Sequence, residues 1–544
     1  MIRCDSLAHN QRSRNRNRAT SRRGAVLVVV VVVTVLLTLG ALTLSQLMLA
    51  EYRSARLAAY RAQDRLLAES GVEAMRVFLV QDEQLMLESG GAFNNPDLLR
   101  GVLVTDGTHP QEVGRFTVLS PLWSEDGRSV LGLRFGVEDE SARINLNVLV
   151  AWENSVEGAG RAVLMQLPGM EEMTADAILD WLDEDDEQRE FGAEIDSYST
   201  LEPPYTPRNG PIHTLEELLL VQGVTEELLF GVDRNRNGLP DAGESDPMAF
   251  VNVDNSDGGM TTGWASYLTL HSKETNLASD GSEKIYLNEE DLEDLHESLS
   301  NALGEQQATY IIGYRQFGLY EGEDPLQPMP SGDIDFDTDA TTEITNLAQL
   351  LGGAVEMSFE GQPQKAIVAS PFSIEAEAMA TYVPELLDHC TTTEEPTPGK
   401  ISIYQAPRIA LMTIPGMTDE IANRIIADRI QDPIMRIDED MQNVAWLLTR
   451  EIVTAEEMAS IMPYICSNDG AVRRMQIVGF RDSGGRGLRM EVVMDVSEQS
   501  PKILALRDME SLGRGYPLEL LGVGIESNGV AGFSTAASST ESTY

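Results

Sequence analysis

This chain has few of the residues from which common catalytic and metal centres are built. It contains three cysteines and six histidines in 544 residues, and no His lies at a metal-ligand spacing from another His or a Cys. The sequence contains neither a nucleophile elbow nor a phosphate-binding loop. We therefore expect a protein that is not an enzyme.

Positive charge is also scarce beyond the N-terminus. The chain has 40 Lys and Arg against 87 Asp and Glu, and its formal net charge is −47. Residues 1–24 hold seven arginines and one acid, so the rest of the chain carries −53. Such a surface repels nucleic-acid phosphates and favours divalent cations or basic partners. We expect no nucleic acid among the partners.

Charged residues are absent from Gly24 to Ala50. A helix of that length spans about 40 Å, against about 30 Å for the hydrocarbon core of a membrane. The run is too long for the apolar region of a secretory signal. Because the preceding arginines should stay in the cytoplasm, we predict a single-pass membrane protein whose chain after Ala50 is exported. An ordinary anchor with a basic cytoplasmic tail is the simplest form of this prediction.

The helical pattern continues beyond the membrane span. Proline is absent from residues 25–88, and apolar residues keep a three-four spacing from Leu57 to Phe78, with Asp64 as the polar exception. We predict one continuous helix over residues 25–88, apolar all round in its first half and amphipathic in its second half.

Alternating apolar and polar residues predict strands near both ends of the remaining chain. The predicted strands cover residues 115–120, 131–137, 473–480, 488–496 and 502–508. The segment "DSGG" (482–485) suits a hairpin turn between two of them.

The resulting fold class is α+β, with a long N-terminal helix and a small antiparallel sheet. The sheet is predicted in two parts, residues 111–143 and 470–520, and a mainly helical, acidic insertion at 144–466 interrupts it. The Ser- and Thr-rich segment 525–544 predicts a disordered tail.

The insertion contains an internal repeat. "LPGM" at Leu167 and "IPGM" at Ile414 are each preceded by a short apolar segment and followed by a helical pattern. The repeats predict units near 144–231 and 401–466, and a fainter copy near 285–352 lacks the turn. The turn resembles the helix-hairpin-helix of DNA-binding proteins, but acidic residues follow both copies. We therefore predict a corner that packs two helices, not a phosphate site.

The segment "DRNRNGLPDAGE" (233–244) has the spacing of a calcium loop, with oxygen-bearing side chains at alternate positions and Gly238 at the sharp turn. The predicted ligands are Asp233, Asn235, Asn237, the backbone carbonyl of Leu239, Asp241 and Glu244. Pro240 lacks the N–H through which paired loops bond, and no clear helix follows. We predict a lone structural calcium loop, and a solvated turn is the alternative.

A second candidate cation site is the acidic stretch that begins at residue 183. Its predicted ligands are Asp183, Asp185, Asp186 and Glu194. A cation would relieve the repulsion among these crowded carboxylates, and an exposed acidic loop without a metal is the alternative.

An arginine-rich leader that ends in Gly24, followed by an uncharged helix that becomes amphipathic, resembles the type IV prepilin family. The resemblance implies that a prepilin peptidase cleaves after Gly24 on the cytoplasmic side. Ala25 would then become the N-methylated first residue, and the helix would stay in the inner membrane.

Later landmarks narrow the resemblance to the K minor pseudopilin of type II secretion systems (general secretion pathway protein K). They are "VEDESARINLN" (137–147), "LPGM", "DWLDEDDE" (180–187), "GAE" (192–194), "PPYTPRNGPI" (203–212), "LEELLLVQGV" (215–224) and "GRGYP" (513–517), in that order. Val29 holds the fifth mature position, where most pilins carry Glu and where absence of Glu is typical of the K subunit. Residues 232–400 match less well.

This resemblance implies a protein that helps to start and cap the tip of the periplasmic pseudopilus. The implied partners are the I- and J-type minor pseudopilins, the other pseudopilins of the filament, the prepilin peptidase and the inner membrane. The implied cofactor is Ca²⁺, as one or two structural ions. The rival functions are a tip minor pilin or adhesin of a type IV pilus and a membrane-anchored DNA-binding protein of an uptake system.

The cysteines divide between the leader and the exported part. Cys4 would leave with the leader, whereas Cys390 and Cys466 would remain in an oxidising compartment. These two could form a disulfide or stay free thiols.

Overall fold

The structure is a computed structural model. It describes residues 22–81, 83–124, 130–239, 241, 244, 262–278, 280–322, 327, 334–359, 365–436, 441, 443–466, 469–498 and 500–524. The predicted leader up to residue 21 and the predicted tail at 525–544 lie outside these residues. The chain divides into two compact parts, an N-terminal part up to residue 63 and a C-terminal part from residue 64 onward.

The N-terminal part consists of the greater part of helix α1 (Arg22–Phe78). Every side chain from residue 26 to 59 is exposed. Among the described residues, α1 is the one helix that is long and apolar enough to cross a membrane. Its length and composition are those of a single membrane anchor.

In the C-terminal part, the last residues of α1 pack on a sheet and are held there by a buried ion pair. Arg481 donates from Nε to Asp64 Oδ1 at 2.8 Å and from Nη2 to Asp64 Oδ2 at 3.2 Å. Gly479 is required beside this pair, because a Cβ there would lie 2.2 Å from the carbonyl oxygen of Asp64. The polar exception in the helical pattern is therefore an anchor of the helix on the sheet.

The helix ends earlier than the sequence predicts. It stops at Phe78, and a separate short helix α2 covers Glu83–Glu88. Phe78 and Leu79 are the last consecutive buried residues, and Val80 is exposed. The prediction of one helix to residue 88 was wrong at its end, because the apolar stripe runs out there and a missing proline does not by itself extend a helix.

The sheet is antiparallel and is split in sequence, as predicted. Its strands are β1 (Val102–Thr105), β2 (Gly114–Trp123), β3 (Val130–Arg134), β4 (Glu138–Asp139), β11 (Val472–Arg481), β12 (Leu488–Asp495) and β13 (Lys502–Asp508). The order is β1-β2-β11-β12-β13, with β3 on β2 and β4 on β11. Val118 of β2 faces Ile477 of β11, so an early and a late strand pair in register. The α+β class is confirmed.

Short helices and bridges fill the insertion between β4 and β11. The first unit (144–231) and its partner strand contain β5 (Ile144–Asn145), α4 (Leu149–Ser155), α5 (Ala159–Leu164), α6 (Glu172–Leu182), α7 (Ile195–Tyr198), η3 (Leu215–Leu220), α8 (Glu226–Phe230) and β6 (Leu268–Thr269). The third unit (401–466) contains α12 (Arg408–Leu411), α13 (Asp419–Asp428), α14 (Trp446–Thr449) and α15 (Ala455–Ile461).

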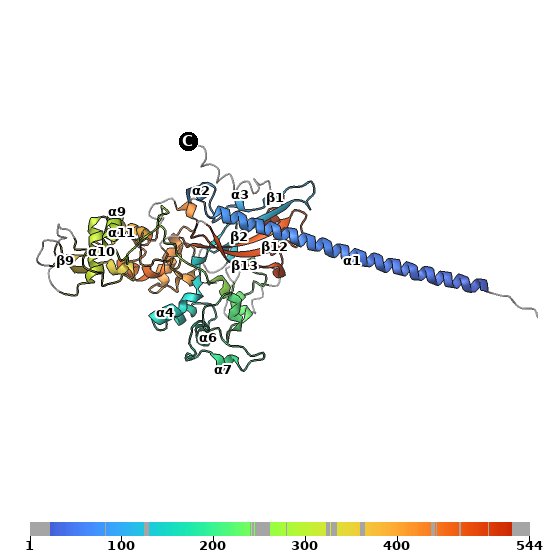
Figure 1. Cartoon of the computed structure of the whole chain (residues 1–544), viewed down its shortest axis with the longest axis horizontal. Coiled ribbons are helices and arrows are strands. Elements are labelled where there is room, and N and C mark those ends of the chain that lie inside the picture. The colour runs from blue at the N-terminus through green and yellow to red at the C-terminus, as the bar shows by residue number, and fades with distance from the viewer. Residues whose placement is uncertain are drawn as a thin grey trace, which may run out of the picture. The chain divides into compact units, whose positions relative to one another are not determined.

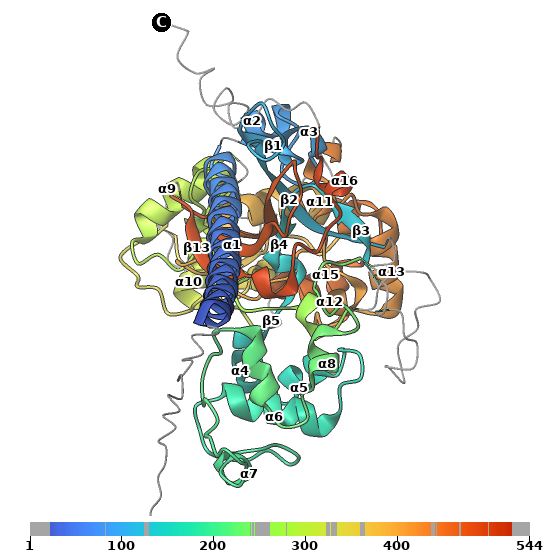
Figure 2. The ribbon, with the colours of Figure 1, turned by 90° about the vertical axis from the view of Figure 1, so that its right-hand side faces the viewer.

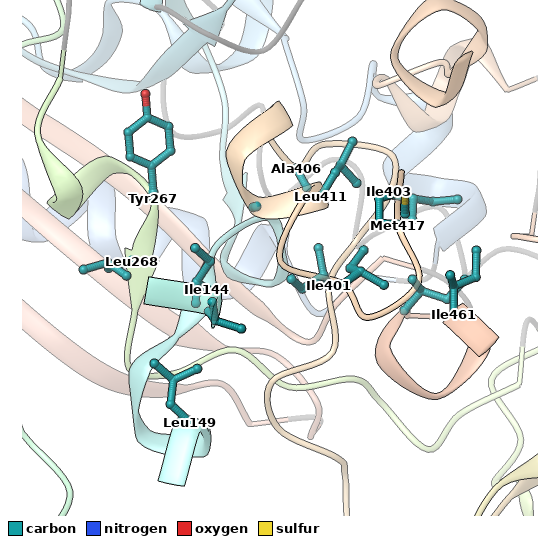
Figure 3. Close-up of a cluster of buried hydrophobic side chains, with 14 of the residues drawn as sticks. Ile144, Leu149, Tyr267, Leu268, Ile401, Ile403, Ala406, Leu411, Met417 and Ile461 are labelled. Atoms are coloured by element: carbon teal, nitrogen blue, oxygen red, sulfur yellow. The ribbon is translucent and has the colours of Figure 1, made fainter. Parts of the chain in front are cut away.

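The two PGM turns have the same backbone geometry. In the first unit the N–H of Leu167 donates to Leu164 O, and the N–H of Met170 donates to Leu167 O. Ile414 and Met417 make the corresponding bonds in the third unit. Gly169 and Gly416 both adopt left-handed φ values, 68° and 84°. The turns are therefore helix-packing corners, and both units bury residues in one shared core (Figure 3).

The middle segment of the insertion has a core of its own, formed by residues 287–390. It contains β7 (Ile285–Tyr286), α9 (Leu292–Ala302), α10 (Glu305–Phe317), β8 (Ala354–Met357), β9 (Ala366–Ala369), α11 (Ala376–His389) and β10 (Cys390–Thr391). Figure 1 and Figure 2 show α9 and α10 grouped away from α4, α6 and α7. Its relation to the other two units as a degraded copy stays a prediction.

Candidate metal centres

The predicted calcium loop follows α8, and its side chains accept hydrogen bonds from its own backbone. Asp233 is buried, and its carboxylate accepts the N–H groups of Asn237 at 3.0 Å and Gly238 at 2.7 Å. Asn235 Oδ1 also accepts the N–H of Asn237, at 3.0 Å. These bonds hold the backbone in the tight turn for which Gly238, with φ of 70°, is suited.

The second half of the loop brings the remaining predicted ligands together. Asn235 and Asn237 donate from Nδ2 to Asp241 Oδ2, at 2.6 and 2.9 Å, and the N–H of Asp241 donates to Glu244 Oε2 at 3.1 Å. Pro240 lies outside the described residues. Burial is the main cause that raises the pKa of Asp233, and the charge of Glu244 adds to it.

The donor set of this loop suits a hard cation. It offers carboxylate, amide and carbonyl oxygens, which are the ligands that Ca²⁺ takes. The two amides now present their NH₂ groups to Asp241, so ion binding requires that Asn235 and Asn237 turn their oxygens inward. Consistent with this, no three His, Cys, Asp or Glu side chains form a ready metal cluster within the described part of the chain.

The acidic stretch after α6 contains buried carboxylates without enough cations around them. Asp180, Asp183 and Glu194 are 0%, 5% and 4% exposed. Arg189 donates from Nη1 to Asp180 Oδ1 at 2.7 Å and also bonds Asp183 Oδ2. Three of these carboxylate oxygens have no hydrogen-bond partner among the described residues: both oxygens of Glu194 and Oδ1 of Asp183. Orphaned buried carboxylate oxygens of this kind are expected where a cation binds.

Burial also shifts the titration of these groups. It raises the pKa of Glu194 to about 7, assisted by the negative charges of Asp180, Asp183, Asp186 and Asp185. Burial likewise raises the pKa of Asp183 to about 6, although Arg189 acts in the opposite direction. Arg189 alone therefore does not balance the negative charge of this site, and a divalent ion would supply further positive charge.

The structure sorts the four predicted ligands of this stretch into two groups. Asp183 and Glu194 are buried together with Asp180, which the sequence reasoning missed. Asp185 and Asp186 are exposed, and they accept bonds from Glu187 N and Asn209 Nδ2 instead. The helical period could have found Asp180, since it lies three residues before Asp183 at the end of α6.

Cys390 and Cys466 are both buried free thiols. Cys390 belongs to the core of the middle segment, whereas the N–H of Cys466 bonds Ile401 O in the third unit. Burial raises the pKa of Cys390 to about 12 and that of Cys466 well above its ordinary value. The two residues are not joined as a disulfide, because the fold places them in different parts of the insertion.

The predicted processing site lies at the start of the described chain. Gly24 and Ala25 fall in the first turn of α1, next to Arg22, where the helix begins. The expectation that cleavage occurs between them stays a prediction, as does the absence of enzymatic activity.

These features define a class: an α+β protein with an N-terminal helix that is long and apolar enough to cross a membrane and with a mainly helical insertion inside its antiparallel sheet. Residues 142–232 match the protein-family model described as type II secretion system (T2SS), protein K. This segment, which holds the first unit and the buried carboxylates, is thus similar to protein K of type II secretion systems. The comparison with curated proteins finds no match.

A solved structure also matches the chain. It is described as the GspK-GspI-GspJ complex from the type 2 secretion system of enterotoxigenic Escherichia coli. The sequence identity is 11%, the TM-score is 0.31, and the match covers 84% of this chain and 99% of the other.

Proposed function

We propose that this chain is a K-type minor pseudopilin that helps to start and cap the pseudopilus of a type II secretion system. The observation that carries the proposal is the position of the protein K segment, residues 142–232, directly after β4 of a pilin-like sheet. The sheet packs on the end of an N-terminal helix whose first part has the composition of a membrane anchor.

The same helix supports a membrane origin and a place at the tip. A prepilin peptidase would cleave after Gly24 and leave the anchor in the inner membrane, with the remainder in the periplasm. Val29 and its neighbours are exposed and apolar, so the fifth position of the mature helix has no carboxylate that could pair with a subunit ahead of it. The insertion between β4 and β11 adds bulk that is hard to place inside a packed filament.

We also propose one or two structural Ca²⁺ ions. Asp180, Asp183 and Glu194, which do not form a ready metal cluster in the structure, would have to close around one ion, whose two positive charges would offset the buried carboxylates. The second site is the loop formed by Asp233, Asn235, Asn237, the carbonyl of Leu239, Asp241 and Glu244. In both places the chain supplies hard oxygen ligands in a fold that is short of positive charge.

Partner binding tests the proposal. The full chain is co-expressed in membranes with I- and J-type minor pseudopilins and a prepilin peptidase, and the complex is purified through a tag on the J-type protein. We expect all three subunits in one complex, in equal amounts. A pair of minor pilins from a type IV pilus serves as the matched control. Binding to that pair and not to the I- and J-type pair would overturn the proposal in favour of a pilus tip pilin.

A further inference from the structure

The calcium loop rests on the face of the pilin-like sheet, although more than 200 residues separate the two in sequence. Arg489 of β12 donates from Nη1 to Arg236 O at 3.2 Å, and its Nη2 bonds Asn235 O. Gln476 of β11 donates from Nε2 to Arg236 O at 3.0 Å. Side chains of the sheet therefore donate hydrogen bonds to two carbonyls in the middle of the loop, those of Asn235 and Arg236.

A third contact comes from the segment after β13. Asn237, a predicted ligand, donates from Nδ2 to the carbonyl of Gly515 at 2.6 Å. Gly515 has φ of 76°, and a Cβ there would lie 2.5 Å from Arg489 Nη1. The "GRGYP" segment is thus shaped to admit the arginine and the loop together. Tyr516 completes the contact by donating from its OH to Gln476 Oε1 at 2.6 Å.

Arg489 is unusual because its charge is completely buried without an ion pair. Its side chain is 0% exposed, and it forms no salt bridge with any carboxylate among the described residues. It bonds the two loop carbonyls and Gln476 Oε1 at 3.4 Å, and its guanidinium carbon lies 5.5 Å from the centre of the Tyr516 ring. Burying an unpaired charge is costly, so the arginine needs a nearby negative charge. The loop supplies that charge, since Arg489 acts on the carboxyl of Asp233.

The loop and its seat are already balanced in formal charge before an ion binds. Asp233, Asp241 and Glu244 bring three negative charges, and Arg234, Arg236 and Arg489 bring three positive charges. The contribution of the seat is therefore geometric, because its hydrogen bonds fix the carbonyls of Asn235 and Arg236, which lie between the predicted ligands Asp233 and Asn237.

We propose that Arg489, together with Gln476, is a seat that positions the 233–244 loop for calcium, so that calcium binding and docking of the insertion on the sheet are coupled. The inference rests on the proposed calcium role of this loop. Arg489 is a positioning residue, not a ligand. By thermodynamic reciprocity, a seat that favours the ligand geometry raises calcium affinity, and calcium in turn strengthens the docking.

The test uses the full chain in detergent, with Glu194→Gln as background so that only the 233–244 loop is titrated. Calcium affinity is measured by calorimetry for Arg489→Gln and for Arg486→Gln, which removes an equal charge from an exposed position of the same hairpin. We expect Arg489→Gln to weaken calcium binding at least tenfold and Arg486→Gln to leave it unchanged. Gln476→Ala, which keeps the buried charge, should weaken binding about threefold and serves if Arg489→Gln does not fold.

A second readout follows the sheet itself. In the background chain, calcium should slow amide hydrogen exchange in β12 and in residues 513–517, and Arg489→Gln should abolish this protection. Equal calcium affinity in Arg489→Gln or Gln476→Ala and in the background chain would overturn the seat. No calcium binding in the background chain would overturn the proposed metal role of the loop, and the coupling with it.

Discussion

The first and third units use the same corner and then place opposite charges at the same point. Helix α6 follows the first PGM turn and ends at the C-cap Asp183; helix α13 follows the second turn and ends at the C-cap Arg429. Both cap residues have an extended backbone, and each donates its N–H to a carbonyl of the last turn, Leu179 O or Ile425 O. A buried carboxylate and a buried guanidinium thus occupy equivalent places.

The charge of the C-cap residue determines which counter-charge each unit requires. Arg429 donates from Nη1 to the carbonyls of Ile403 and Ala406, so the third unit contains its own cation. Burial lowers the pKa of Arg429 to about 10. The first unit has the carboxylate of Asp183 at this position, with Glu194 beside it. Arg189 bonds Asp183, but both oxygens of Glu194 are left without a hydrogen-bond partner among the described residues. Nε and Nη2 of Arg429 have no hydrogen-bond partner among the described residues, so the third unit carries uncompensated positive charge where the first unit carries uncompensated negative charge.

Calcium should give the largest difference between the units. At free calcium about 1,000 times the dissociation constant, one site stabilises the fold by about 4 kcal/mol. Hydrogen-exchange mass spectrometry of the full chain, with calcium or with chelator, should show faster exchange in α6 and α7 upon chelation and no change in α13. Equal changes in both units would contradict the comparison.

The same site predicts a pH dependence of the metal-free chain. The raised pKa of Glu194, about 7 against an ordinary 4.5, means that the folded chain keeps a proton that the unfolded chain has lost between these values. Stability in chelator should therefore fall as pH rises from 4.5 to 7. In calcium this loss should disappear. Thermal melting measured across this range checks the sign, and parallel curves with and without calcium would count against it.

Removing the built-in cation should destabilise the third unit whether or not calcium is present. Arg429→Met deletes hydrogen bonds from a charged donor to two buried carbonyls, at about 1.5 kcal/mol each, so we expect a loss of about 3 kcal/mol. Chemical denaturation in calcium and in chelator measures it. A loss that depends on calcium would mean that the two units are not independent.

Crowding near Asp180 predicts a smaller effect in the first unit. A Cβ at Gly192 would lie 1.8 Å from Asp180 Oδ2, so Gly192→Ala should cost about 2 kcal/mol and weaken calcium binding. Gly210→Ala is the matched control, because a Cβ there meets nothing within 4 Å. Equal unfolding midpoints for the two variants would show that the close approach is not required.

The helix caps should behave alike in both units and give the smallest effect. Thr225 and Thr454 each accept a backbone N–H at 3.3 Å at the start of α8 and α15. Each Thr→Ala change should cost about 1 kcal/mol. The backbone N–H of Thr454 also donates to Glu457 Oε2 in a capping box, so the loss for Thr454→Ala should be slightly larger in denaturation experiments.

Local patterns in the sequence predicted most of the elements. Alternation gave β2, β11, β12 and β13, and the repeated PGM turns gave the two corners, because each depends on residues close in sequence. Strand β1 was missed, since a Gly- and Pro-rich stretch surrounds its four residues. The end of α1 was misplaced, because it depends on where the sheet stops.

Long-range contacts explain what the sequence could not predict at the sites. The spacing of the 233–244 loop predicts a set of ligands, but it could not show that Arg489 contacts this loop from another part of the chain. In the acidic stretch, spacing could not tell the buried Asp183 from the exposed Asp185 and Asp186. Nor could it indicate that Cys390 and Cys466 lie in different parts of the insertion.

The intact mass of the full chain tests the central claim most directly. The chain is expressed in membranes with and without a prepilin peptidase that is active on a control substrate. The account predicts that the peptidase removes residues 1–24 and that the product gains one methyl group at Ala25. An unchanged mass would contradict it, because α1 would then be an ordinary anchor and not the stem of a filament subunit.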